Sequence, residues 1–432
     1  MEVLSHTPAR WSIARKFFTI FFAFFFGMQL IDMLISFELL PGFVNSFFSF
    51  YVNAWEWLIK WTGTNILHIS YPISVLPNGS GDTTYNYVQL FLWVIIGILV
   101  ATLWVIFDRK HSSFRRLEYW IRILIRYYLG YTLLIYGFIK VIKLQFPFPG
   151  LARLTQPYGE SSPMGLAWTF IGYSSGYNIF IGSAEVIAGI LLFFKRTTLL
   201  GALISMTVMA NVAAMNFSYD IPVKLFSVNL VILSAYLVSY DWHRLRNVFL
   251  LNRPADAAQL AMPRPKKWKL ITQYTVKALA IAYMLYGTLW QSLKSRYEYG
   301  DLAPKPPLYG IYNVSDFLRN HDTILPLTTD TSRWKQIIIS SRNYATVKMM
   351  SDSIRSMKLA IDTVLRTATF KDSRDTMLVY AFQYAVPQTG KLVLTGKFRS
   401  DSMLIATDRF DENRFRLVNR GYHWINEYPY NR

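Results

Sequence analysis

Long apolar runs, separated by short polar stretches, occupy most of the first 290 residues of the chain. A helix needs about 20 mainly apolar residues to cross the hydrocarbon core of a membrane. Seven stretches of about this length lie at residues 17–37, 87–107, 121–143, 177–194, 198–216, 222–240 and 270–290. The pattern therefore predicts an α-helical membrane bundle of about seven transmembrane helices, with the lipid bilayer as a partner.

The segment Phe43–Trp61 does not follow this pattern. Its tryptophans, Trp55, Trp57 and Trp61, are interleaved with polar residues. Tryptophan rings are enriched at the depth of the lipid headgroups, and helices with one apolar and one polar face lie in that layer. We expect this segment to form an interfacial helix rather than a span.

After residue 290 the pattern changes to that of a soluble domain. Residues 291–310 contain Pro304, Pro306 and Pro307, which predict a stiff linker. Short runs of strand-favouring residues follow at 336–340, 345–349, 357–362, 377–386, 392–398, 403–407 and 415–418. Short strands at such close spacing predict an all-β or β-rich domain, built as a small antiparallel sandwich or barrel.

Local signals add detail to this C-terminal domain. The segments Pro387–Gly390 and Asp411–Asn413 predict hairpin turns, and Val314–Arg319 predicts a short helix. The end of the chain, Asn419–Pro429, is dense in aromatic and polar residues. We expect it to pack back onto the domain and close its core, with an exposed recognition surface as the alternative.

These patterns divide the chain into four parts. They are a two-span region with the interfacial segment (1–120), a four-helix membrane bundle (121–241), a basic loop with the last span (242–299) and the β-rich domain (300–432).

Composition supports the membrane class. Charged residues make up 16% of the chain, against about 25% in soluble domains. The net charge of +19 does not indicate nucleic-acid binding, because the basic residues lie mostly beside apolar spans. The absence of cysteine excludes thiolate-bound iron–sulfur clusters and Cys-type zinc sites. Because no histidine lies in the middle of a predicted span, we expect no haem between the helices. With the missing cysteines, we also expect no iron–sulfur cluster, zinc or other metal site.

The distribution of Lys and Arg predicts the orientation. With the N-terminus inside the cell, the inner segments carry 16 of these residues and the outer segments before the last span carry 3. Basic residues favour the cytoplasmic side of a membrane. We therefore expect a multi-pass protein of the cytoplasmic (inner) membrane, with a cytoplasmic N-terminus and an extracytoplasmic C-terminal domain.

Six polar residues in or beside four of the spans are unusual for a membrane interior: Lys140, Glu185, Asn211, Asn216, Asp220 and Lys224. An ionisable residue at membrane depth costs about 2.5–3.5 kcal/mol on insertion scales, so such residues are functional candidates. In the predicted orientation all six fall in the outer half of the bilayer. We interpret them as an outward-facing, ligand-binding polar pocket, with Glu185 as its deepest charge and Lys140 or Lys224 as its partner.

Structural roles are the alternative for the same residues. The lysines can extend to the headgroups without binding anything, and Arg126 can do so at the inner surface. A Glu185–lysine pair can clamp two helices together, and Asn211 and Asn216 can hydrogen-bond between helices. The small residues Gly182–Gly189 predict that their helix packs closely on a neighbour.

Several segments of residues 121–241 resemble the DoxX/DoxD-like family of integral membrane proteins. The resemblance lies in Arg126–Gly130, Tyr136–Lys140, Gly182–Gly189, Lys195–Arg196 and Asn216–Lys224. It covers about a quarter of the chain and implies a four-helix membrane core. One branch of that family is associated with thiosulfate:quinone oxidoreductase, so the resemblance implies a quinone as a candidate cofactor.

Two functions remain open from the sequence. The first is a redox-linked membrane protein, such as a quinone-linked oxidoreductase component, that binds a quinone or another lipid-soluble molecule in the polar pocket. The second is a non-catalytic membrane scaffold or assembly factor, whose β-rich domain binds a protein partner of the cell envelope. No sequence motif identifies the substrate or decides whether the protein is an enzyme.

Overall fold

The structure is a computed structural model, and its two compact units are described separately. It describes residues 11–36, 42–75, 79–108, 111–255, 267–375 and 377–431. The first unit comprises Met1–Ile142 and Ile179–Ser292, and the second comprises Lys143–Asn178 and Leu293–Arg432. The basic loop predicted within residues 242–269 lies partly outside the described residues.

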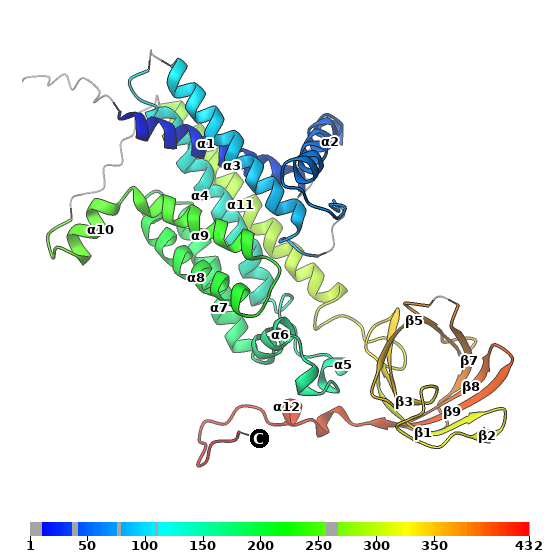
Figure 1. Ribbon diagram of the computed structural model, residues 1–432. Coiled ribbons are helices and arrows are strands. Elements are labelled where there is room, and N and C mark those ends of the chain that lie inside the picture. Colours follow the sequence, from blue (N-terminus) through cyan, green and yellow to red (C-terminus); the bar gives the residue numbers. More distant parts are fainter. Residues whose placement is uncertain are drawn as a thin grey trace, which may run out of the picture. The chain divides into compact units, whose positions relative to one another are not determined.

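The first unit is helical (Figure 1). Its helices, two of which continue into the second unit, are α1 (Ile13–Ser36), α2 (Gly42–Asn65), α3 (Thr84–Phe107), α4 (Arg115–Val141), α7 (Ser175–Leu192), α8 (Thr198–Ser218), α9 (Lys224–Ser239), α10 (Trp242–Phe249) and α11 (Lys267–Glu298). Each of the seven predicted spans falls on one of these helices, and the predicted interfacial segment falls on α2.

Four of these helices are long and apolar enough to cross a membrane, judged over the described residues: Ile13–Met33, Thr84–Phe107, Ser175–Leu192 and Thr198–Ser218. A fifth candidate joins α9 and α10, which are bent by 80°. Helices α4 and α11 fall short because basic residues such as Arg122, Arg126 and Lys277 interrupt their apolar surface. The chain therefore contains several apolar helices of membrane length, while the count of seven spans stays a prediction.

Helix α3 illustrates why these helices suit a membrane. Its inner face packs Trp93 and Ala101 into the core of the unit. Its outer face leaves Leu99, Leu103 and Trp104 more than half exposed. A helix that is apolar on all sides is stable where lipid covers the side that protein does not.

Helices α4 and α7 pack with their backbones close together. A Cβ added at Gly137 would lie 2.9 Å from the Gly182 carbonyl oxygen, and one at Gly182 would lie 2.7 Å from that of Gly137. Gly130 of α4 and Gly189 of α7, each seven residues from the first pair, meet in the same way. The predicted close packing of Gly182–Gly189 is therefore confirmed, because only glycine fits at these contacts.

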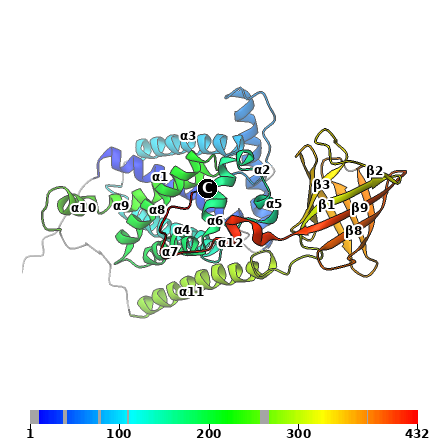
Figure 2. The same ribbon diagram turned by 90° about the horizontal axis from the view of Figure 1, so that it is seen from below.

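The second unit contains a closed antiparallel barrel (Figure 2). Its strands are β1 (Gly310–Arg319), β3 (Trp334–Ile339), β4 (Tyr344–Met349), β5 (Ile354–Asp362), β6 (Thr367–Asp372), β7 (Val379–Ala385), β8 (Lys391–Phe398) and β9 (Asp401–Phe410). Each strand pairs with the next in this order, and β1 also pairs with β9. The short β2 (Asp322–Thr323) pairs with β1. The prediction of a small antiparallel β domain is confirmed, as a barrel.

Side chains fill the barrel interior. Trp334 is fully buried, and its ring lies 5.6 Å from that of Phe370, 5.1 Å from that of Tyr380 and 6.0 Å from that of Phe382. Alternate residues along the strands point inward, as the burial pattern of β5 shows. A barrel of eight strands is just wide enough for such a packed core.

Shorter elements complete the second unit. They are α5 (Leu151–Leu154), η1 (Tyr158–Glu160), α6 (Pro163–Tyr173), η2 (Glu412–Arg414) and α12 (Arg416–Asn419). Leu151 of α5 packs with Ile311 of β1 and Ile338 of β3 in a small apolar cluster. This contact joins the segment that follows α4 to the wall of the barrel.

Several predictions for this domain are wrong. Val314–Arg319 is part of β1, because pairing with β9 outweighs its local helical preference. Asp411 does not begin a hairpin, because its side chain accepts a hydrogen bond from the Asn413 amide and starts η2. The segment predicted as a strand at 415–418 belongs largely to α12, and β6 was missed.

Two further predictions need correction at the ends of the domain. Part of the proposed linker, up to Glu298, is helical and belongs to α11. The C-terminal segment does not close the core, since Tyr422, Trp424 and Tyr428 are each more than 80% exposed.

Candidate functional site

Lys140 and Glu185 form a buried ion pair between α4 and α7. The Lys140 Nζ lies 2.8 Å from Oε1 and 2.7 Å from Oε2 of Glu185. The side chains are 7% and 1% exposed, respectively. The pair lies next to the Gly137–Gly182 contact, because Lys140 also touches Gly182. Of the two partners predicted for Glu185, the structure selects Lys140, in the geometry of a clamp between helices.

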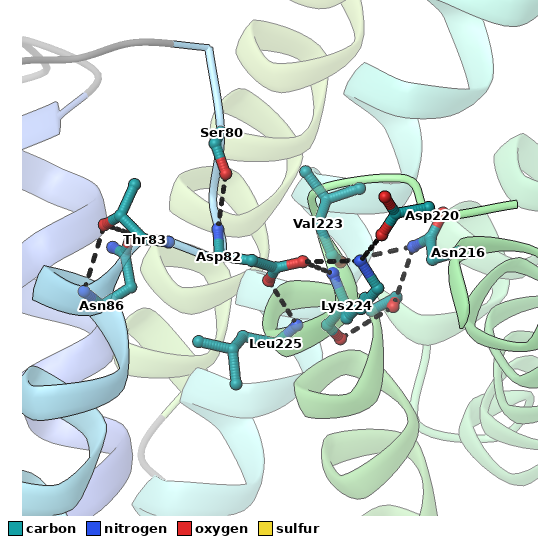
Figure 3. A network of polar contacts seen from close by, with 10 residues as sticks. Ser80, Asp82, Thr83, Asn86, Asn216, Asp220, Val223, Lys224 and Leu225 are labelled. Atoms are coloured by element: carbon teal, nitrogen blue, oxygen red, sulfur yellow. Dashed lines mark hydrogen bonds and ion pairs between the residues drawn. The ribbon is translucent and has the colours of Figure 1, made fainter. Parts of the chain in front are cut away.

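Asn216, Asp220 and Lys224 form a second set of contacts where α8 turns into α9 (Figure 3). The Lys224 Nζ lies 3.0 Å from Asp220 Oδ1. The Asn216 Nδ2 donates to the Ser227 Oγ at 3.0 Å and to the Val223 carbonyl at 3.3 Å. The Asp220 side chain is 87% exposed, so this set lies at the surface end of the two helices.

Asp82, which sequence reasoning missed, binds the start of α9 (Figure 3). Its carboxylate accepts hydrogen bonds from the amides of Lys224 at 2.7 Å and Leu225 at 2.9 Å. The first amides of a helix lack partners within it and attract negative charge. Asp82 therefore caps α9 from a loop some 140 residues earlier in the chain.

The six predicted residues do not form one pocket. Lys140 pairs with Glu185, while Asn216, Asp220 and Lys224 join Asp82. Asn211 is exposed on α8. Arg126, expected to extend to the inner surface, is instead buried and donates to the Leu192 carbonyl at the end of α7, at 2.9 Å.

A cavity of about 330 Å³ lies between α1, α3, α4 and α9. Asp32 near the end of α1, Asn86 at the start of α3, Tyr136 late in α4 and Leu225 at the start of α9 line it. These four residues therefore lie where α1 and α4 end and where α3 and α9 begin. Gly81, next to the capping residue Asp82, also lines the cavity, and its amide donates to the Pro222 carbonyl at 2.8 Å.

The cavity walls are largely apolar, with polar groups at a few points. The side-chain amide of Gln89 lies beside the Asp32 carboxylate. Gln29 and Asn229 exchange two amide hydrogen bonds, at 3.0 and 2.8 Å, between α1 and α9. The Trp93 Nε1 is buried and has no hydrogen-bond acceptor among the described residues.

Tyr136 connects the cavity with the buried ion pair. It lines the cavity, and its carbonyl oxygen lies 3.5 Å from the Lys140 Nζ. Its ring centroid lies 5.5 Å from the same nitrogen. The Lys140–Glu185 pair therefore supports a wall of the cavity from behind.

Sequence reasoning missed Asp32, although one signal for it was present. Asp32 is an acidic residue within the first predicted span, and such a residue is a functional candidate by position alone. The amide pair Gln29–Asn229 and the Asp82 cap gave no such signal, because their partners are far apart in sequence.

Comparison with known proteins gives one relative and no function. No family model and no solved structure matches the chain. The chain is 33% identical over 137 residues to "Uncharacterized protein YwoB" of Bacillus subtilis (strain 168), a match that covers 31% of this chain and 85% of that protein. At this identity and coverage of the relative, the chain belongs to the family of YwoB.

Proposed function

We propose that this protein is a multi-pass membrane protein that binds a lipid-soluble small molecule in the cavity between α1, α3, α4 and α9. The observation that carries the proposal is the cavity itself, with about 330 Å³ of space and Asp32, Gln89 and Trp93 in its walls. Small-molecule sites are concave, mainly apolar and equipped with a few polar groups, with volumes of about 300–1,000 Å³.

The predicted topology places this cavity near the outer face of the membrane. With seven spans and the N-terminus in the cytoplasm, α1 and α4 end outside, and α3 and α9 begin there. The cavity lining runs from residues near these ends, such as Asp32 and Leu225, to residues halfway along the helices, such as Phe25 and Ile232. We therefore propose that the ligand binds in this cavity and not around Glu185. The Lys140–Glu185 pair supports the cavity wall and does not contact the ligand.

A quinone is one molecule of the proposed class. The resemblance to DoxX/DoxD-like proteins implies it, and its flat aromatic head suits a cavity lined by Phe25, Trp93 and Phe226. Redox chemistry would follow only if the bound molecule is itself redox-active, because the chain has no cysteine to handle electrons or sulfur.

The second function, a scaffold that binds an envelope protein, rests on the C-terminal segment. Tyr422, Trp424, Ile425 and Tyr428 are 72–86% exposed. Aromatic side chains are enriched at protein interfaces. In this reading, Trp424→Ala with Tyr428→Ala reduces the recovery of a crosslinked partner protein, whereas cavity substitutions leave that recovery unchanged.

The ligand-binding function is tested by extracting the full chain in mild detergent and identifying co-purified small molecules by mass spectrometry. Ile232→Trp places a larger side chain in the cavity wall. Ile190→Trp is the matched control, because Ile190 is similarly exposed on α7 but lies outside the cavity. We expect one compound to be enriched with the wild type and with Ile190→Trp and depleted with Ile232→Trp. Equal recovery from all three proteins would refute the proposal.

A further inference from the structure

The charge in the cavity is negative and unbalanced. Asp32 lines the cavity, and among the described residues no Lys, Arg or His lines it or interacts with Asp32. The side chain beside it is the neutral amide of Gln89. A carboxylate removed from water is costly unless a positive charge accompanies it. The Asp32 carboxyl group therefore either takes up a proton or pairs with a cation that the lining residues do not supply.

Aromatic rings surround the same space. Phe25 of α1, Trp93 of α3, Tyr128 and Tyr136 of α4, and Phe226 of α9 all line the cavity. The faces of aromatic rings attract cations, and cages of such rings are a known means of binding ammonium groups. A ring-lined cavity with one carboxylate is thus complementary to an organic cation.

We propose that the ligand of this cavity is a lipophilic cation, an amine or quaternary ammonium compound whose positive nitrogen pairs with Asp32. This inference rests on the proposed function, and it selects a cationic ligand in place of the neutral quinone. The apolar part of the ligand contacts the aromatic walls.

A metal ion does not fit the same position. Hard metal ions require six or more oxygen ligands at close range, and the described residues contain no group of three or more His, Cys, Asp or Glu side chains. The cavity is also far larger than an ion, since its volume is about 330 Å³. An organic cation both fills this space and balances the charge of the Asp32 carboxylate.

The test compares two probes of the same shape that differ in charge. Benzyltrimethylammonium is a cation, and neopentylbenzene has carbon in place of its nitrogen. Tritium-labelled forms of both are titrated onto the full chain in lipid nanodiscs, with empty nanodiscs subtracted. We expect the wild type to bind the cation about tenfold more tightly than the neutral probe or better, and Asp32→Asn to abolish that preference while its affinity for the neutral probe stays unchanged.

Glu298→Gln is the control, because it removes a carboxylate of α11 that lies outside the cavity; it should retain the preference for the cation. If wild type and Asp32→Asn bind both probes equally well, the inference is overturned and the proposed function stands. If neither probe binds the wild type, both the inference and the proposed function are overturned.

Discussion

At the scale of single residues, the main contact is the buried Lys140–Glu185 ion pair. Both groups are withdrawn from water, and each stabilises the charge of the other. A buried ion pair adds little stability over an apolar pair of equal size, but the loss of one partner leaves an uncompensated charge. A structural clamp therefore shows itself as a large loss of folding stability when one partner is replaced, whereas a ligand contact shows itself as a loss of ligand affinity.

Glu185→Gln is therefore expected to destabilise the protein by about 3–5 kcal/mol, because the Lys140 ammonium stays buried without its carboxylate. The double substitution Lys140→Met with Glu185→Leu should recover most of that loss. Thermal unfolding of the three proteins in detergent measures both effects. A single variant as stable as the wild type would show that the clamp is unimportant.

Asp82 acts at the same scale, as the cap of α9. Asp82→Ala removes an acceptor from two backbone amides, and hydrogen bonds to a charged group contribute about 1.5–3 kcal/mol. We expect faster hydrogen exchange at Lys224 and Leu225, measured by mass spectrometry, with the end of α9 unaffected. Unchanged exchange at these two amides would contradict the assigned cap.

At the scale of elements, the helices and most strands were predictable. Apolar runs of membrane length became helices because nothing else satisfies their backbone in lipid, and alternating runs became strands. The failures occurred where distant partners decide the structure. Val314–Arg319 became a strand through β9, and β6 is recognisable only because β5 and β7 pair with it.

The α4–α7 contact gives a prediction of its own at this scale. A Cβ at Gly182 would lie 2.7–2.9 Å from three atoms of α4, so Gly182→Ala should force the helices apart and lower the melting temperature. Gly287→Ala is the matched control, since a Cβ there meets nothing within 4 Å. In that helix, alanine is favoured over glycine by about 1 kcal/mol. Equal melting temperatures for the two variants would contradict the close contact.

The candidate site was only partly predictable. The pairing of Glu185 with one of two lysines, Lys140 or Lys224, followed from their charges. Their separation into a clamp and a capping network did not, because it depends on how four helices meet. The cavity is formed by residues such as Gln29 and Asn229, whose polar character becomes informative only once α1 and α9 are adjacent.

At the scale of the whole molecule, the central question is orientation. The chain contains no cysteine, so single cysteines report their own location. We expect Ser400→Cys, in the β8–β9 turn, to react with a membrane-impermeant maleimide added to intact cells. Ser112→Cys, between α3 and α4, should react only after the cells are opened. The reverse pattern would overturn the orientation, and labelling of both sites in intact cells would overturn the span count.

The account as a whole depends on an occupied cavity between α1, α3, α4 and α9. The most direct measurement is a cryo-electron microscopy map of the full chain in lipid nanodiscs, bound to an antibody fragment that recognises the barrel. The account predicts non-protein density enclosed by Asp32, Trp93 and Tyr136, in contact with the Asp32 carboxylate. A cavity closed by the protein's own side chains, or one that holds only water, would contradict it.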